Sequence, residues 1–373
     1  MTKDGRRSPL VEAFSDLTDP RIDRTKRHLL IDIVVLAVSC IICGAETWED
    51  VELVAEEKID FFSRFLELPN GIPSHDTFER VFARLNPDEL QSCFRGWTEN
   101  VVKLTAGEII AIDGQRLRRS FDKSHNRAAI HMVSAWAVEN KIVLAQQKVD
   151  DKSNEIPAMQ NLIDLLEIKG CIVTSDAMGC QQDIATKIIA KDGDYVFGLK
   201  GNQGNTLDCV KAHFDTNSTP KSMTLETVDA DHGRIETRLY KVASADAVID
   251  LKSWPGIKTV IAVESTREIR EVISTETRFY ISSLPTEPKK IARAIRGHWG
   301  VENSLHWVLD VTFNQDRSRI RKDNGPENFA VLRHLAINLI KLTPIAKKRS
   351  IKGKRLKSLL NNEFLETVMF SEN

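Results

Sequence analysis

The sequence predicts an α/β protein in which a mixed sheet is flanked by helices and preceded by a helical domain. Three patterns predict this class. Apolar residues recur at helical spacing from about residue 8 to residue 97. Short apolar runs and one helical pattern then follow in the order strand, strand, strand, helix, strand. From about residue 202 to 287, polar and apolar residues alternate, as in strands with one buried face.

The N-terminal region, residues 1–100, is expected to be a helical domain that binds DNA. Helical spacing covers residues 31–43, 51–65 and 77–85, and Ser74 to Asp76 supply N-cap chemistry for the last of these. Arg80 and Arg84 on that helix could contact a DNA backbone, although an ordinary amphipathic surface helix has the same pattern. The longest apolar run, about 15 residues near Cys40 and Cys43, contains Asp32 and is too short for a membrane span. We therefore expect a buried helix, no membrane partner and two buried cysteines.

The next region is expected to form the catalytic core, residues 101–200 and 288–340. Strands are predicted at 108–113, 130–138, 141–149 and 172–176, with a helix at 156–170 before the fourth strand. Asp113 ends the first strand and Asp176 ends the fourth. Parallel pairing of these two strands would place both carboxylates side by side. This order of elements is typical of the opening of a ribonuclease H-like fold.

Two further regions complete the predicted organisation. Residues 201–287 are expected to be a β-rich insertion, and a helix is expected from about Pro288 to Leu309, which includes Glu302. Residues 341–373 are predicted to be a basic C-terminal tail, because eight basic residues lie between Lys341 and Lys357 and no acid occurs before Glu363.

The three acidic residues Asp113, Asp176 and Glu302 are the candidate catalytic and metal-binding residues. Carboxylate oxygens suit Mg²⁺, and two such ions about 3.5–4 Å apart can activate water and stabilise the leaving oxygen in phosphodiester cleavage. Asp113 and Asp176 would hold both ions and Glu302 one, with Mn²⁺ able to replace Mg²⁺. Each acid alone also has an ordinary role as a turn former or helix cap.

Basic residues are locally clustered, although 52 Lys and Arg nearly balance 53 Asp and Glu over the chain. One cluster follows Asp113 and a second follows Glu302, and both could contact phosphates, although a solvated basic loop is the alternative. The clusters comprise Arg116, Arg118, Arg119, Lys123 and Arg127, and Arg317, Arg319 and Arg321.

The segment around Glu302 allows a second interpretation. His298, Glu302 and His306 lie four residues apart and would share one face of a regular helix, as in a zinc hydrolase. The HExxH pattern of helical zinc sites is absent, and this interpretation leaves the two strand-end aspartates without a role.

The chain resembles the DDE transposases of bacterial insertion sequences, specifically the group that includes the H-repeat-associated proteins. The resemblance rests on AIDGQ around Asp113, TSDAMGCQ around Asp176, and the long stretch from HWGVENSLHW to AVLRH. It implies a ribonuclease H-like core with Asp113, Asp176 and Glu302 as the metal-binding triad. Related transposases often have Arg and Lys where this chain has His298 and Leu309, which leaves Arg296, His298 and His306 as the expected DNA contacts.

The resemblance implies metal-dependent cleavage and strand transfer at insertion-sequence ends. The expected partners are the element's inverted-repeat ends, target DNA and further copies of the chain in a synaptic complex. The expected location is the bacterial cytoplasm, associated with the nucleoid. The alternative is a catalytically silent, transposase-derived protein that still binds DNA.

Overall fold

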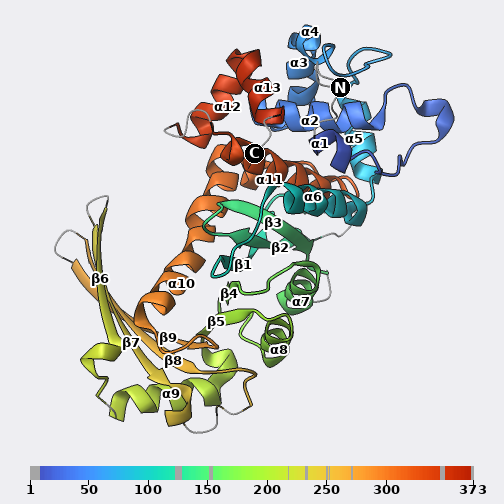
Figure 1. Cartoon of the computed structure of the whole chain (residues 1–373). Coiled ribbons are helices and arrows are strands. Elements are labelled where there is room, and N and C mark those ends of the chain that lie inside the picture. The colour runs from blue at the N-terminus through green and yellow to red at the C-terminus, as the bar shows by residue number, and fades with distance from the viewer. Residues whose placement is uncertain are drawn as a thin grey trace.

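A nine-stranded mixed sheet runs through the computed structural model of the chain (Figure 1). The structure describes residues 9–121, 128–150, 154–216, 218–231, 234–248, 251, 253–269, 272–344 and 349–370. The strand order is β3-β2-β1-β4-β5-β9-β8-β7-β6. The strands are β1 Ile109–Arg116, β2 His131–Ala137, β3 Ile142–Lys148, β4 Ile172–Ser175, β5 Asp194–Leu199, β6 Thr224–Asp231, β7 Arg234–Ser244, β8 Thr259–Ile269 and β9 Val272–Ser282. The predicted class, a mixed sheet flanked by helices, is confirmed.

Helices cover both faces of the half of the sheet formed by β1 to β5. The helices that the structure describes are α1 Pro9–Ala13, α2 Leu30–Cys43, α3 Trp48–Glu57, α4 Ile59–Phe62, α5 His75–Arg84, α6 Pro87–Val101, α7 Glu155–Leu165, α8 Gln182–Ala190, α9 Gly204–Thr216, α10 Pro288–Val301, α11 Gly325–Leu342, α12 Ile351–Leu360 and α13 Asn362–Phe370. Of these, α7 and α8 cover one face of β1 to β5 and α10 covers the other. Alternation along β1 explains the two layers, since Ile110 and Ile112 pack in the core that includes α7 and α8. Ile109 faces the other way, into the core shared with α10.

The predicted insertion continues the sheet of the core. Strand β9 pairs antiparallel with β5, and β8, β7 and β6 follow, each antiparallel to its neighbour. The two long hairpins form the end of the sheet opposite β3, with α9 at their base (Figure 1). One continuous hydrogen-bonded ladder therefore connects the insertion to the strands that carry the candidate acids.

Helix α2 is the centre of the N-terminal helical region. All of its residues from Asp32 to Cys43 are buried, as the prediction of a buried helix requires. Its neighbours include α3, α11, α12 and α13, and Asp32 accepts a hydrogen bond from the Leu68 amide at 3.0 Å. Within the described ranges no single helix is long and apolar enough to cross a membrane, although α2 and α3, bent by 92°, pass that test as a pair.

The C-terminal segment is folded against this helical region, where the sequence predicted a basic tail. Helices α12 and α13 both contact α2. Arg355 is buried and donates to the Ile41 carbonyl at 3.1 Å and to the Thr312 carbonyl, while Lys354 donates to the Ile340 carbonyl at 2.9 Å. These two basic residues cap helix carbonyls, so they are not available for DNA; residues 345–348 lie outside the described ranges.

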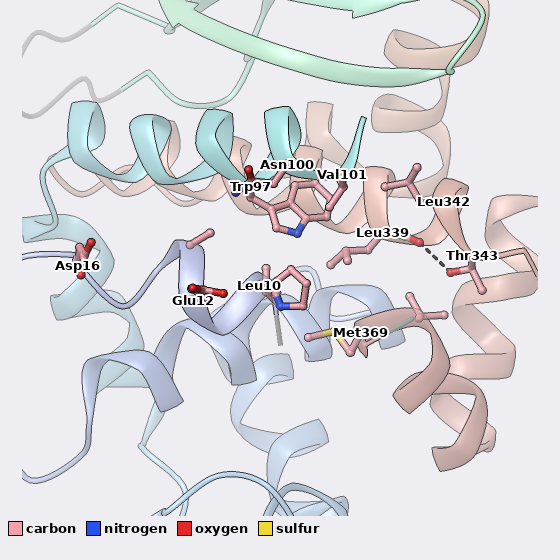
Figure 2. A pocket seen from close by; sticks show the side chains of 13 residues that line it. Leu10, Glu12, Asp16, Trp97, Asn100, Val101, Leu339, Leu342, Thr343 and Met369 are labelled. Atoms are coloured by element: carbon pink, nitrogen blue, oxygen red, sulfur yellow. Dashed lines mark hydrogen bonds between the residues drawn. The ribbon is translucent and has the colours of Figure 1, made fainter. Parts of the chain in front are cut away.

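A cavity of about 650 Å³ lies between α1, α6, the end of α11 and α13 (Figure 2). Its charged lining consists of Glu12 and Asp16, and apolar side chains such as Trp97 and Leu339 form much of the rest. No basic side chain lines it within the described part of the chain. Its charge is therefore opposite to what a phosphate backbone requires.

The helix predicted from Pro288 to Leu309 changes from α-helical to π-helical geometry at Glu302, one of the three candidate acids. The α-helix α10 ends at Val301, and the chain continues as π-helical turns over Glu302–His306 and Val308–Thr312. Gly297 allows α10 to lie close to β1, because a Cβ at this position would be 2.9 Å from the Ile109 side chain. Such π-turns within helices are frequent at functional sites, and this one begins at Glu302.

Candidate active site

Asp113 and Asp176 are adjacent across the central pair of parallel strands. Strand β1 pairs in parallel with β4, and Ile112 is directly opposite Ser175. Asp113 is the next residue of β1, and Asp176 is the first residue after β4. Their carboxylates are also held locally, since the Gly114 amide donates to Asp113 Oδ1 and the Met178 amide to Asp176 Oδ1, both at 2.9 Å.

Glu302 faces the same cavity as the two aspartates. This cavity, about 530 Å³ in volume, is lined by all three acids and by residues of α10, β5, α9 and β9. Among the residues that the structure describes, no three His, Cys, Asp or Glu side chains are arranged to hold a metal ion as they stand. The three carboxylates thus converge on one space without forming a closed ligand shell.

The electrostatics of Asp113 suit a cation in this space. Burial raises its pKa from the ordinary value of 3.8 to about 7; the Gly114 amide opposes this, and the carboxylates of Asp176, Glu155 and Glu302 add to it. Carboxylate oxygen is also the donor type that Mg²⁺ prefers. The residues present therefore fit a divalent cation in chemistry and in charge.

Two histidines of the same segment lie beside the acids. The Nδ1 atom of His306 lies 3.5 Å from Asp113 Oδ2, and Nδ1 of His298 lies 3.2 Å from the Thr174 hydroxyl. Burial lowers the pKa of each to about 4, so both are neutral near pH 7. His306 is buried beneath Asp113, which argues against the predicted direct contact with DNA.

The zinc interpretation required His298, Glu302 and His306 on one helical face. The π-helical turn that starts at Glu302 changes the angular spacing along this segment. His298 and His306 consequently contact different partners, Thr174 and Asp113.

A fourth acid, which the sequence reasoning did not identify, lies next to Asp113. Glu155 begins α7, and its Oε1 atom is 2.9 Å from Nε2 of His131. Its carboxylate occupies the space over Gly114, where an added Cβ would be 2.5 Å from Glu155 Oε1. The close approach of Glu155 therefore requires a glycine at position 114. No local sequence pattern reveals this contact, because the two residues are far apart in the sequence.

The cavity also contains positive charge that the sequence reasoning missed. Lys200, directly after β5, and Lys211 on α9 are exposed and line the cavity, as does Arg278 on β9. They come from three different elements of the core and the insertion. Only their spatial convergence distinguishes them from ordinary surface lysines and arginines.

The two predicted basic clusters form one surface at the end of β1. Nε of Arg118 lies 3.3 Å from Asp316, and Nε of Arg321 donates to the Arg119 carbonyl at 2.9 Å. Arg116, Arg317 and Arg319 of the same segments are exposed. Segments about 200 residues apart thus present arginines together, and Lys123 and Arg127 of the first cluster lie outside the described residues. The remaining predicted contact, Arg296, is on α10 and pairs with Asp229 at 3.2 Å.

Comparison with known proteins identifies the family. Residues 105–339 match the family described as transposase DDE domain, and residues 11–98 match the family described as DDE_Tnp_1-associated. The "H repeat-associated putative transposase YhhI" of Escherichia coli (strain K12) is 39% identical over 368 residues, which cover 96% of this chain and 97% of that protein. The "Putative transposase YncI" of Escherichia coli O157:H7 is 40% identical over 369 residues, 97% of this chain and 94% of the relative.

A solved structure, the piggyBac transposase synaptic complex with hairpin DNA, aligns over 96% of this chain and 77% of its own, with a TM-score of 0.43 and 12% identity. That similarity is too low to establish a common fold. The two family matches and the relatives that span the whole chain are decisive: the chain belongs to the DDE transposases, in the group of the H repeat-associated proteins.

Proposed function

We propose that this chain is a catalytically active transposase that cleaves DNA at the ends of its element and joins the freed 3′ ends to target DNA. The observation that carries the proposal is the convergence of Asp113, Asp176 and Glu302 on one cavity. The order and direction of β1 to β5, an antiparallel meander followed by two parallel strands, support a ribonuclease H-like core.

The three acids would act as metal ligands with unequal freedom. Asp113 and Asp176 are fixed by strand pairing and by backbone amides, so they would hold both ions. Glu302 is exposed at the start of the π-helical turn and would complete one ligand shell by turning toward them. Bound Mg²⁺ supplies charge neutralisation at the scissile phosphate and a lowered pKa for the attacking water.

The remaining residues of the cavity would position the substrate. Lys200 and Lys211 offer cationic groups to a phosphate that enters the cavity. His306, neutral and buried against Asp113, would hold that carboxylate in place. Such a site processes one DNA end, so joining two ends to a target would require at least two copies of the chain.

The test uses purified protein and a duplex that carries the DNA flanking its coding region. We expect nicking that requires Mg²⁺ or Mn²⁺ and stops in EDTA. Asp113→Asn, Asp176→Asn and Glu302→Gln should each reduce nicking by about a hundredfold or more, because even outer-shell partners of metal ligands matter by about 10–100-fold. Binding of the duplex should persist in all three variants.

A matched control is Asp183→Asn, an exposed acid on α8, away from the cavity; its nicking should equal that of the wild type. Unchanged nicking by Asp113→Asn would refute the assignment of the site. Binding without any metal-dependent nicking by the wild type would instead favour the catalytically silent DNA-binding protein.

A further inference from the structure

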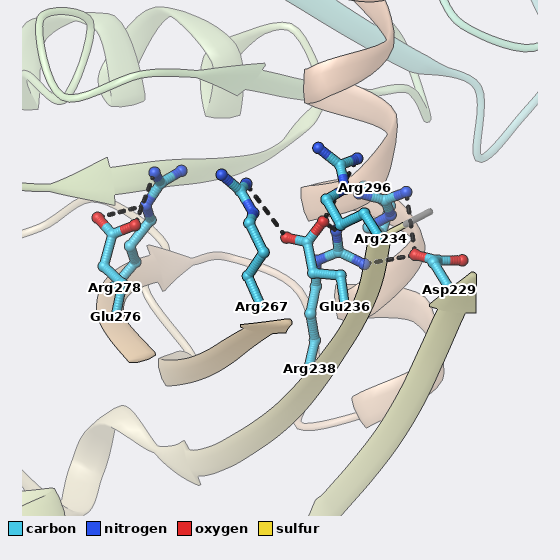
Figure 3. Close-up of polar contacts among 8 residues, drawn as sticks. All are labelled: Asp229, Arg234, Glu236, Arg238, Arg267, Glu276, Arg278 and Arg296. Carbon is cyan, nitrogen blue, oxygen red and sulfur yellow. Dashed lines mark hydrogen bonds and ion pairs between the residues drawn. The ribbon is translucent and has the colours of Figure 1, made fainter. Parts of the chain in front are cut away.

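A second groove lies between the insertion and α10, beside the cavity with the three acids. Its volume is about 470 Å³. One wall is the outer half of β7, β8 and β9, and the other is the last part of α10, with Arg296 and Trp299. Figure 3 shows Arg296 above the charged side chains of the strands. Nearer the core, the same sheet face carries Tyr240 and Val242, which pack with Ile291 and Ile295 of α10. The groove begins where arginines replace these apolar residues.

The arginines of β7, β8 and β9 all lie on this one face of the sheet. Strand register places Glu236 opposite Arg267, Arg238 opposite Ser265, and Arg278 opposite Val263, and directly opposed residues share a face. Arg234 lies two residues before Glu236 and therefore points the same way. On the opposite face of these strands, as far as they are described, there is no arginine, and Glu264 and Glu268 are present. The sheet is thus charged asymmetrically, with its arginines turned toward α10.

The carboxylates in the groove are too few to occupy these arginines. Glu236 is shared by three of them, with Arg238 at 2.6 Å and both Arg234 and Arg267 at 3.7 Å (Figure 3). Asp229 is shared by Arg238 and Arg296. The side chains of Arg234 and Arg267 are 47% and 48% exposed. A guanidinium carries five N–H donors, so most of these donors remain available to another anion.

The groove is continuous with the catalytic cavity. Arg278, Trp299 and Glu302 line both spaces. Arg278 is fixed at the junction, because it binds both oxygens of Glu276 at 2.9 and 3.0 Å and lies over the Trp299 ring at 4.7 Å. A chain of phosphates that leaves the three acids in this direction would meet Arg278 first and then Arg267 and Arg234.

We propose that this arginine groove binds the sugar–phosphate backbone of the DNA strand that passes through the active site. The inference rests on the proposed function for the identity of the strand, and on the groove itself for the chemistry. Arginine forks match phosphate geometry, and successive phosphates suit several arginines in a row. The groove is bounded by one helix and one sheet face, and the occupant that we assign to it is the backbone of one strand.

The experiment measures DNA binding in the absence of cleavage. The parent is the full-length Asp113→Asn protein, the probe is a fluorescent duplex of the flanking sequence, and anisotropy is recorded over a series of salt concentrations. In this parent, Arg234→Ala with Arg267→Ala should weaken binding by roughly tenfold. The slope of log K against log[salt] should become shallower by about 2, since each phosphate contact contributes about 0.9.

Two controls separate backbone binding from other effects. Lys169→Ala with Lys187→Ala removes two ion-paired cations, one before β4 and one on α8, that line neither space, and should leave affinity and slope unchanged. Arg234→Lys with Arg267→Lys keeps the charge and should restore most of the slope. Equal thermal unfolding of all variants shows that the fold is retained.

The outcomes distinguish the two proposals. If the Arg234/Arg267 double alanine variant binds with the parent's affinity and slope, the groove does not hold the backbone, whether or not the wild type cleaves DNA. If the slope becomes shallower as expected but the wild type never nicks DNA with Mg²⁺, the groove is supported and the catalytic proposal fails.

Discussion

Replacing Asp113 by Asn tests the electrostatic description of the site in the absence of any DNA. The folded protein holds this carboxylate among Asp176, Glu155 and Glu302, and burial is the largest cause of its raised pKa. Asn has nearly the same shape and no charge. The substitution should therefore remove the cost of ionising Asp113 in the folded state and leave the packing unchanged.

The size and sign of the effect follow from the pKa. An Asp with an ordinary pKa of 3.8 and a folded-state pKa of about 7 binds its proton more tightly in the folded than in the unfolded protein. Between these values the folded state holds more protons, so the wild-type free energy of unfolding falls as the pH rises from about 4 to about 7. At about 1.4 kcal/mol per pH unit the total is about 4 kcal/mol, an upper limit for a partly exposed group.

The assay is urea unfolding of wild type and Asp113→Asn at pH 5 and pH 8, in EDTA and in Mg²⁺. In EDTA the variant should be more stable than the wild type at pH 8, by up to about 4 kcal/mol, and the difference should be smaller at pH 5. Mg²⁺ should stabilise the wild type at pH 8 and have little effect on the variant. Equal stabilities of the two proteins at pH 8 in EDTA would refute the electrostatic description.

Two further substitutions test how the site and the C-terminal segment are built. Gly114→Ala should destabilise the protein by about 1–3 kcal/mol, because its Cβ would collide with the Glu155 carboxylate. The control is Gly96→Ala, on α6 with open space around it, which should stabilise the protein by about 0.5–1 kcal/mol. Urea unfolding measures the free energy of unfolding of both variants. Arg355→Met should lower the free energy of unfolding by about 3 kcal/mol, because buried carbonyls lose their donor. The control is Lys352→Met, at an exposed residue of the same helix. If Arg355→Met destabilises the protein no more than Lys352→Met does, α12 does not anchor the C-terminal segment.

The pairing of the central strands could be predicted because its signals are local. Each apolar run between residues 108 and 176 is short and bounded by turn residues, and the helix before the fourth strand favours a parallel crossover. The observed register, with Ile112 opposite Ser175, has this parallel pairing and brings the two aspartates together. Here the sequence pattern and the three-dimensional structure carry the same information.

The end of α10 could not be predicted from the local sequence, because the packing of this helix depends on a strand that is distant in the sequence, β1. The sequence indicated one helix from about Pro288 to Leu309, and it gave no sign that Gly297 admits the Ile109 side chain of β1. The change to π-helical turns at Glu302 has no distinctive sequence signal. For the same reason, the sequence predicted that His298, Glu302 and His306 share one helical face. In the structure, His298 contacts Thr174 and His306 contacts Asp113.

The C-terminal helices show the limit of arguments from charge. Eight basic residues in 17 positions indicated a solvated tail, yet Lys354 and Arg355 are buried. Both have long side chains whose charged ends reach helix carbonyls, while their apolar stems pack in the core. Local charge density does not reveal whether carbonyl acceptors lie within reach in the folded protein.

The continuity of the sheet connects the insertion to the strands that position the candidate acids. Strand β5 pairs with β4 on one side and with β9 on the other. Lys200 follows β5 and Arg278 lies on β9, and both line the cavity. The hydrogen-bonded ladder that positions β4, and with it Asp176, therefore also positions these two cationic groups. A separate domain on a flexible linker would lose this alignment through thermal motion. Because the arginine groove is built from strands of the same sheet, its distance and direction from the three acids are fixed. A phosphate backbone bound in the groove would therefore already be aligned with these acids.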